Sequence, residues 1–516
     1  MKQGMDIVSS KITMRLPIII LFSAVLLSSF LTPAYQDTQC VCGTRKALLV
    51  LADFPEYPHI SSRDEITTLF FNKVARYFYD VSYSRVMISG NATDWIRLPK
   101  LYSQYAVPNI YTTAMNVAED AFHSASQSFN LTAFDYVFLV LSVYPSLTGD
   151  YIPASYGSIS TKTGLVTGFA VVEEDRDWTA YAHAFALELG LWRLQAQLAG
   201  VGPADVAASG TGDMSSWSKM ALGWINSSQV VTVESPGRRI LTLNPVEDPS
   251  TDPLALRINL GVGAGEYWVE VRESIGYDRN NLQEYGAMVS YVPPTNASIQ
   301  FQKVLQPDIV SKAVFLDTGA DLSIIALNSN QDRYSLLLGD EEDGRDAQTS
   351  VYAMYRAQGA IQVAETENRF NNLDLAQTLL ANAHELFDLG KFTDADAMAI
   401  SAETTANTAT VPLDYSQAAQ LLESAEALKN STIDANSHQA VALVQQANEQ
   451  LDIAKHAFDL RDFSTTKEAA QAAIDLFNRA KQMQLYDTFL GWLSNLVLLV
   501  PVIILAFALR YQLKRV

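Results

Sequence analysis

The sequence predicts a multidomain protein with an α/β domain, an all-β sandwich, an all-α helical stalk and a C-terminal transmembrane helix. Three observations support this fold class. The chain of 516 residues is too long for one ordinary domain. Its hydrophobic pattern alternates first between strands and helices, then shows short strands alone, and then Ala-rich helices. Finally, an apolar segment lies near each end. The predicted bounds are 1–35, 44–228, 229–346, 349–485, 489–509 and 510–516.

The α/β domain, residues 44–228, is predicted from buried strands that alternate with helices. Two continuous apolar runs have the length of buried strands, and three segments have the pattern of helices. Ser62 and Glu65 have the spacing of a capping box at the start of the first helix. The strands are Lys46–Phe54 and Asp135–Val143, and the helices are Ser61–Asp80, Pro108–Phe122 and Trp178–Leu194.

The sandwich, residues 229–346, is predicted from eight short strands between Val230 and Leu338 that turns separate every eight to twelve residues. The glycine-rich run Gly261–Gly265 lies between two of these strands. It lacks the helix and lysine of a phosphate-binding loop, so we interpret it as a hairpin turn. The acidic run Gly339–Asp346 is interpreted as a linker.

The third region, residues 349–485, contains an internal repeat. Ala383–Ala402 and Ala454–Ala473 share the pattern Phe-Asp-Leu-x-x-Phe at a spacing of 71 residues. Each copy is predicted to form a helical hairpin, and such hairpins stack as a bundle or short solenoid. Next to a membrane span, this region is interpreted as a stalk. A peptide-binding groove of the tetratricopeptide type stays open as an alternative.

Two apolar segments predict the topology. Residues 1–35 carry a basic start, an apolar run and small residues, which is typical of a secretory signal or an uncleaved anchor. Phe489–Leu509 has 21 residues without a charge, enough to cross a membrane. Arg510, Lys514 and Arg515 follow, so the tail 510–516 is expected in the cytoplasm. The sequence therefore predicts a single-pass protein of the cell membrane with an extracytoplasmic ectodomain.

Charge and cysteine content restrict the partners. The net charge of −20 argues against nucleic acid or anionic lipid as a ligand of the bulk surface. The only cysteines, Cys40 and Cys42, are too close for an ordinary disulfide, and we interpret them as thiols or as a link to a partner. Export is consistent with two further features of the sequence. A chain of this composition fits a prokaryotic envelope, and sites for N-glycosylation occur at Asn91, Asn130, Asn226, Asn296 and Asn430.

From Lys46 to about Val292 the chain resembles the secreted metallopeptidases of the immune inhibitor A type, which are zincin-like. Four segments in the family's order carry the resemblance. The strand KALLVLADFP ends in Asp-Phe-Pro, and YFYDVSYSRVMISGNATDWIRLP has Ser84 where the family has Gly. MSSWSKMALGWI contains Trp-Ser-Lys and Leu-Gly-Trp, and EYWVEVRESIGYDRNNLQEYGAMVSYV contains Glu-x-Arg and Gly-x-Asp.

The zinc motif of that family is degenerate in this chain. In the pattern H-E-x-G-H-x-x-G-L-x-D, two histidines on one helix face bind zinc, and the glutamate activates water. Laid on the helix Trp178–Leu194, the pattern keeps His183. It places Ala184 at the general base, Leu187 at the second ligand and Arg193 at the third. Glu188 does not restore the site, since five residues after His183 it points about 140° away.

The resemblance and its degenerate motif lead to one hypothesis and two alternatives. The hypothesis is a cell-surface pseudoprotease that binds a protein or peptide partner or serves as an envelope component, with His183 a hydrogen-bonded core residue. The first alternative is an active zinc metalloendopeptidase with distant ligands such as His59 or His123. The second is an envelope or carbohydrate adhesin that works through the sandwich. Calcium stays open at two acidic runs, Glu173–Asp177 and Asp340–Asp346.

Overall fold

The structure is a computed structural model, and it divides into two compact units. The first comprises Met1–Val351 with Leu386–Thr393, and the second Tyr352–Glu385 with Asp394–Val516. The expected signal or anchor, residues 1–35, lies outside the described residues. Those residues are 40–142, 155–191, 202–208, 210–234, 237–248, 250–279, 281–295, 298–307, 309–330, 333–431 and 438–513.

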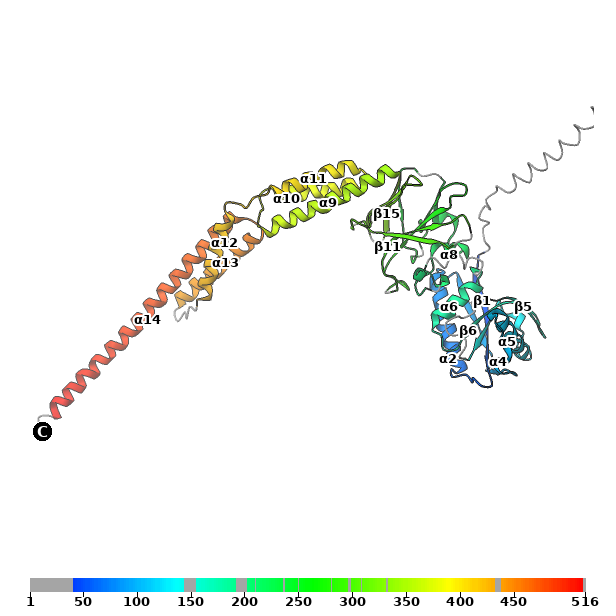
Figure 1. The fold of residues 1–516 in the computed structure, drawn as a ribbon. Helices are drawn as coiled ribbons and strands as arrows, with labels where there is room; N and C mark the ends of the chain where they lie inside the picture. Colours follow the sequence, from blue (N-terminus) through cyan, green and yellow to red (C-terminus); the bar gives the residue numbers. More distant parts are fainter. Residues whose placement is uncertain are drawn as a thin grey trace, which may run out of the picture. The chain divides into compact units, whose positions relative to one another are not determined.

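The first unit begins with a mixed α/β sheet, as the alternating pattern predicts. Its strand order is β2-β1-β4-β6-β5, and β3 also pairs with β1 (Figure 1). All neighbours are parallel except β5, which runs antiparallel to β6 at the edge. The strands are β1 (Gly43–Asp53), β2 (Val86–Ala92), β3 (Ile96–Arg97), β4 (Tyr136–Leu141), β5 (Ser155–Thr161) and β6 (Gly164–Glu173).

Helices cover both faces of this sheet because β1 buries alternate side chains on opposite sides. Leu49 and Leu51 pack in the core cluster that contains α6 (Trp178–Glu188), whereas Leu48 and Val50 pack in the cluster of α5 (Ile110–Ala125). The first helix runs through α2 (Arg63–Thr68), the π-helical η1 (Leu69–Val74) and α3 (Ala75–Val81), while α4 (Tyr102–Tyr105) is a single turn. The predicted capping box of Ser62 and Glu65 is confirmed.

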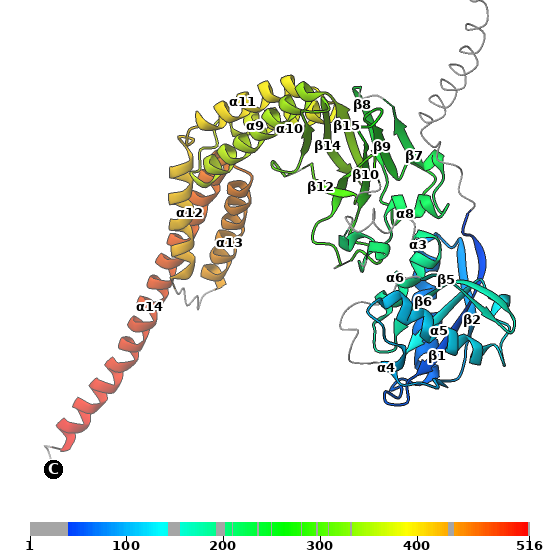
Figure 2. The ribbon, with the colours of Figure 1, turned by 45° about the vertical axis from the view of Figure 1, so that its right-hand side comes forward.

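Two further sheets form a sandwich around one hydrophobic core, in the orders β12-β11-β10-β9-β7 and β13-β14-β15-β8 (Figure 2). The sequence analysis missed β12, since its first three residues are exposed and show no buried alternation. The strands are β7 (Val230–Val233), β8 (Arg239–Leu243), β9 (Ala255–Asn259), β10 (Glu266–Arg272), β11 (Gly286–Val292), β12 (Gln300–Leu305), β13 (Val314–Asp317), β14 (Leu322–Asn330) and β15 (Arg333–Gly339).

Two local expectations were wrong. The acidic run Gly339–Asp346 is not a linker, because α9 (Glu341–Thr366) begins inside it. The Asp340 carboxylate accepts a hydrogen bond from the Asp343 amide at 2.9 Å, and acidic side chains stabilise a helix start. The two cysteines are not thiols. Cys40 and Cys42 form a disulfide, because a bend of the chain brings their Cα atoms to 5.2 Å, a distance usual for such bonds.

The second unit is helical, and its repeat is larger than a hairpin. One core cluster joins α9, α10 (Leu373–Asp388) and α11 (Phe392–Asn407), and another joins α12 (Tyr415–Asn430), α13 (His438–Asp459) and α14 (Phe463–Leu513). The repeat is thus a three-helix unit. A hairpin of two 16-residue helices fills only half of a 71-residue period, which leaves room for the third helix.

The repeated motif Phe-Asp-Leu-x-x-Phe forms the same tight turn in both copies. Gly390 and Arg461 occupy the same position in the motif and adopt positive φ angles of 71° and 59°. Each donates its amide hydrogen to the carbonyl of the first phenylalanine of its copy, at 2.8 and 3.0 Å. The predicted helix–turn–helix is therefore confirmed for both copies, and the left-handed turn residue ends the first helix of each hairpin.

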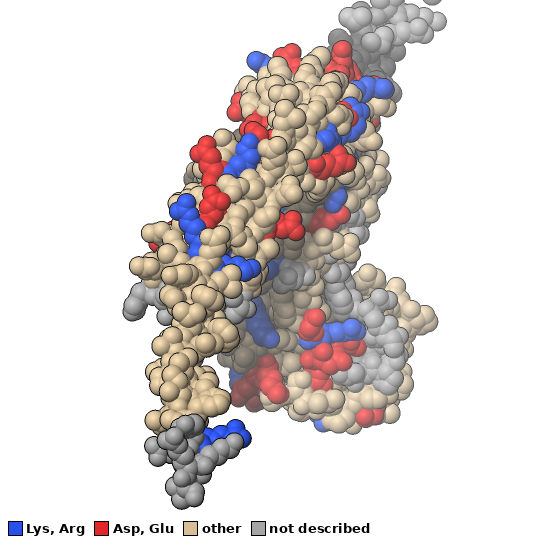
Figure 3. All heavy atoms as spheres, turned by 90° about the vertical axis from the view of Figure 1, so that its left-hand side faces the viewer, with Lys and Arg blue, Asp and Glu red and all other residues tan. Residues whose placement is uncertain are grey.

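The helix α14 continues from the last hairpin into the apolar segment without a break. It is the one helix in the described part of the chain that is long and apolar enough to cross a membrane, with a mean hydropathy of 2.4 in its most apolar window. That window is fully exposed in the structure. On the face shown in Figure 3, the apolar part of α14 presents uncharged surface up to a basic side chain near its end, whereas the helices before it carry both signs of charge.

Candidate functional site

The helix α6 presents the positions of the degenerate zinc motif. Its start is set by Asp177, whose carboxylate accepts the amide hydrogens of Thr179 and Ala180. His183 is buried, and its Nδ1 lies 2.8 Å from the carbonyl oxygen of Val206. A carbonyl only accepts, so Nδ1 carries the hydrogen of a neutral imidazole. Burial also lowers the pKa of His183, which agrees with a hydrogen-bonded core histidine.

The two neighbouring motif positions are part of the hydrophobic core. Ala184 and Leu187 are both fully buried in the cluster that joins α6 to the sheet. Phe185, between them, packs its ring edge-on against Phe70 and Phe78 at centroid distances of 5.7 and 5.0 Å. These side chains supply hydrocarbon contacts and no electron pair for a metal.

Zinc does not fit these residues. A catalytic zinc needs about three protein ligands, and the described motif positions offer one imidazole, one methyl group and one isobutyl group. Arg193, the remaining position, lies outside the described residues. The distant histidines do not complete the set either. His123 is exposed on α5, which covers the opposite face of the sheet from α6, and His59 bonds to Asp53.

Glu188 lies at the last turn of α6 and is partly buried. Burial raises the pKa of its carboxyl group to about 8. Removal of the carboxyl group from water is the cause of this shift. A carboxyl group with this pKa is mostly protonated and neutral at pH 7, and it titrates around pH 8.

The acidic runs proposed for calcium are engaged with protein groups. The Glu173 carboxylate pairs with Arg176 at 2.7 Å, and that of Glu174 accepts the amide hydrogens of Ile60 and Ser61. In the second run, Asp343 pairs with Arg238 at 2.8 Å. Within the described ranges, no group of three His, Cys, Asp or Glu side chains has a geometry suited to a metal ion.

A second polar cluster lies at the carboxyl end of β1, the edge where ligands bind in open α/β sheets. Asp53 ends the strand and is buried. Its carboxylate lies 2.7 Å from Nδ1 of His59 and 2.9 Å from Nε of Arg97. The His59 ring stacks on Trp95 with a centroid distance of 4.5 Å. The arrangement orients a partly exposed imidazole at this edge of the sheet.

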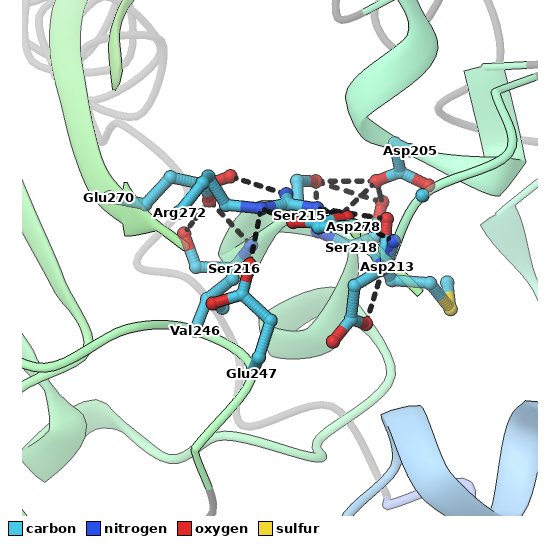
Figure 4. Close-up of polar contacts among 12 residues, drawn as sticks. Asp205, Asp213, Ser215, Ser216, Ser218, Val246, Glu247, Glu270, Arg272 and Asp278 are labelled. Atoms are coloured by element: carbon cyan, nitrogen blue, oxygen red, sulfur yellow. Dashed lines mark hydrogen bonds and ion pairs between the residues drawn. The ribbon is translucent and has the colours of Figure 1, made fainter. Parts of the chain in front are cut away.

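The largest polar cluster is buried where the sandwich meets the α/β part of the first unit, and Arg272 lies at its centre (Figure 4). The guanidinium is fully buried. It contacts the carboxylates of Asp278, Glu270 and Glu247 at 2.7, 2.9 and 3.2 Å. Burial raises the pKa of Asp278, but the charge of Arg272 together with hydrogen bonds from Glu247, Arg272 and the Asp213 amide holds it at about 2. Burial, together with the hydrogen bond to Asp278, raises the pKa of Glu247 well above its usual range, so the guanidinium lies among acids of which Glu247 holds its proton.

A second buried cation, Lys219 on α8 (Ser216–Ala221), extends the cluster toward the α/β sheet. Its ammonium group donates to Asp213 at 3.1 Å, to the Val246 carbonyl at 2.8 Å and to the Tyr83 hydroxyl at 3.2 Å. Tyr83 follows the helix α3, so this contact ties the first sheet's helix to the cluster. Burial raises the pKa of Asp213 to about 6 despite the neighbouring Lys219.

Serine side chains at the start of α8 complete the cluster. Asp205 accepts hydrogen bonds from the hydroxyls of Ser215 and Ser218 at 2.5 and 2.6 Å. Glu270 accepts the amide hydrogen of Ser216 at 2.7 Å. Asp205 also accepts the amide hydrogen of Ser215 at 2.9 Å. The two carboxylates thus satisfy amides at the buried start of the helix, and the bond from Ser216 to Glu270 fixes α8 against β10.

The buried cluster was not predicted, but a signal for it existed. Burial of a charge without a partner is unfavourable, and the partners of these Asp, Arg and Lys residues are far away in the sequence. The signal was the resemblance itself. Lys219 belongs to the Trp-Ser-Lys segment, and Glu270, Arg272 and Asp278 form Glu-x-Arg and Gly-x-Asp. Three of the four matching segments therefore meet in one buried ionic cluster.

Comparison with known proteins adds no assignment, because no family model matches the sequence and no curated protein matches it.

Proposed function

We propose that the chain is a membrane-anchored, non-catalytic binding protein, with a metallopeptidase-like extracytoplasmic module presented on a helical stalk. Its partner is a protein or peptide at the cell surface or in the envelope. One observation carries the proposal: the positions that would supply the base and second zinc ligand are Ala184 and Leu187, packed in the core. A fold can keep its packing and serve binding after its catalytic groups are replaced.

The buried ionic cluster supports this proposal. Arg272 and Lys219 are among the residues that carry the resemblance outside the zinc motif. Both are paired with buried carboxylates, and Lys219 also donates to a backbone carbonyl. Their role in holding α8 and the sandwich to the α/β sheet does not require a catalytic centre. The chain keeps these buried ionic residues, whereas its zinc-motif positions carry apolar side chains. This combination is consistent with a fold that is retained as a scaffold.

The proposal predicts that the full-length protein, purified without chelator, contains no stoichiometric zinc and does not cleave casein. Elemental analysis and a casein assay with and without a chelator measure both properties, and a known zinc endopeptidase serves as the positive control. The alternative of an active enzyme has a different signature. About one zinc per chain, with cleavage that the chelator and His183→Ala both abolish, would contradict the proposal.

The anchor part of the proposal depends on α14 and the basic residues after it. A stretch without charge followed by Arg510, Lys514 and Arg515 favours a cytoplasmic tail. The orientation places both the first unit and the stalk outside the cytoplasm. The disulfide of Cys40 and Cys42 fits this assignment, because disulfides persist in oxidising compartments.

Single cysteines test the orientation, since both native cysteines are disulfide-bonded. Val516→Cys is expected to react with a membrane-impermeant maleimide only after the cells are permeabilised. Ser274→Cys, at an exposed position of the first unit, is the matched control and should react in intact cells. The reverse labelling pattern would place the tail outside and overturn the proposed topology.

A further inference from the structure

An open cavity of about 460 Å³ lies at one end of the sandwich, away from the zinc-motif helix and the buried ionic cluster. It is formed by the turn between β9 and β10, by β11 and β12, and by the turn between β13 and β14. The first turn is the glycine-rich run Gly261–Gly265, which the structure confirms as a hairpin turn. A volume of this size is in the range of small-molecule sites.

One wall of the cavity is a row of side chains on three neighbouring strands. Tyr267 on β10 pairs in register with Tyr291 on β11, which in turn pairs with Gln300 on β12. Residues paired in this way project from the same face of a sheet. The two tyrosine rings lie 5.5 Å apart at an angle of 57°, and since Tyr267 is buried in the sandwich core, the half-buried ring of Tyr291 is the aromatic surface that the cavity offers.

An irregularity in β12 adds a second amide to this wall. Val289 pairs with Lys303 and Ser290 with Phe301, so Gln302 is the extra residue of a β-bulge. A bulge redirects the side chain of its extra residue. Gln302 lines the cavity together with Gln300, the residue two positions before it on the same strand.

The opposite wall presents a fixed carboxylate. Asp317, at the end of β13, accepts hydrogen bonds from the Tyr267 hydroxyl at 2.6 Å and from the amides of Gly319 and Ala320 at 2.9 and 3.2 Å. The Tyr291 hydroxyl donates to the Ala264 carbonyl at 2.8 Å and holds the first turn in place. The turn residues Ala264, Gly319 and Ala320 are small, which leaves the mouth open.

We propose that this cavity binds a neutral saccharide. Aromatic faces pack against the C–H faces of a sugar ring, and the two amides and the carboxylate are suited to its hydroxyl groups. Among the described residues that line the cavity, Asp317 alone is charged, which disfavours an anionic ligand. Three hydrogen bonds already reach this carboxylate, so it acts as an acceptor for hydroxyls more than as a site for a cation. The proposal is independent of the proposed loss of catalysis.

The test uses the full-length protein in an ethylene-oxide detergent, which carries no sugar. Maltotriose, cellotriose, mannotriose and chitotriose are titrated, with binding followed by saturation-transfer NMR. We expect at least one of them to bind. Tyr291→Ala and Ala320→Trp should each weaken that binding at least tenfold, the first by removing an aromatic face and the second by filling the mouth.

Val262→Trp is the control, because it adds the same ring to the same end of the sandwich at a position that is 89% exposed and does not line the cavity. It should leave binding unchanged. Circular dichroism verifies that each variant is folded. The proposal is overturned if none of the four sugars binds, or if Ala320→Trp binds as tightly as Val262→Trp. Preferential binding of Nα-acetyl-lysine methylamide at the same place would also overturn it, by identifying a cation site.

Discussion

Replacing Arg272 with methionine is expected to lower the free energy of unfolding of the first unit by about 3–5 kcal/mol. The guanidinium is fully buried and contacts three carboxylates, from Glu247, Glu270 and Asp278. Methionine fills part of the volume but leaves these carboxylates without their cation. Their charges then lie in a medium of low polarity, and the structure must take up protons or admit water at the cluster.

Tryptophan fluorescence during urea unfolding measures this effect selectively. Six of the seven tryptophans precede residue 269 in the first unit, and the seventh, Trp492, lies in the apolar part of α14. Arg279→Met is the matched control, because Arg279 is exposed and only seven residues away. Equal midpoints for the two variants would show that the buried ion pairs contribute little and that Arg272 is replaceable by hydrocarbon.

The hydrophobic pattern predicted the regular elements well because local periodicity reports burial directly. Continuous apolar runs identified β1 and β4, and the repeated Phe-Asp-Leu-x-x-Phe located two turns whose residues Gly390 and Arg461 share a left-handed conformation. The pattern failed where burial is one-sided or absent. The strand β12, which was not predicted, begins with three exposed residues.

The candidate site was predictable only in part, since a zinc motif is local whereas the ionic cluster is not. The sequence identified His183 and the apolar replacements at Ala184 and Leu187 because the motif lies on one helix. The cluster brings together Tyr83, Lys219 and Arg272 from segments far apart in the chain. Only the tertiary fold shows that each charge has a partner, and the cavity beside Tyr291 likewise depends on strand register.

The pH dependence of stability should reveal Glu188 as a buried acid. Burial raises the pKa of its carboxyl group from 4.5 to about 8. Below pH 4.5 the group is protonated in both the folded and unfolded states and adds no pH dependence. Between pH 4.5 and 8 the unfolded state loses the proton first, so the folded state binds more protons and the free energy of unfolding falls as pH rises. Above pH 8 the loss is complete.

Glu188→Gln removes this titration and should therefore stabilise the first unit at high pH. We expect the two proteins to be similar at pH 4.5 and the variant to be more stable by about 2–3 kcal/mol at pH 9, a value reduced for the partial exposure of the side chain. Asp213, whose pKa is about 6, also makes the free energy of unfolding fall as pH rises, but both proteins contain it. The difference between the two curves isolates Glu188.

Urea unfolding at a series of pH values, again followed by tryptophan fluorescence, provides the two curves. Glu119→Gln on the exposed side of α5 is the control for removal of one carboxylate, and its curve should run parallel to that of the unchanged protein. If the Glu188→Gln curve is also parallel, the carboxyl group is solvated in solution and the end of α6 is more open than the structure shows. The expected result is a difference in the free energy of unfolding that grows from pH 4.5 to 8 and then stays constant. It would mean that Glu188, one residue after the second-ligand position of the degenerate motif, is an acid kept neutral by burial.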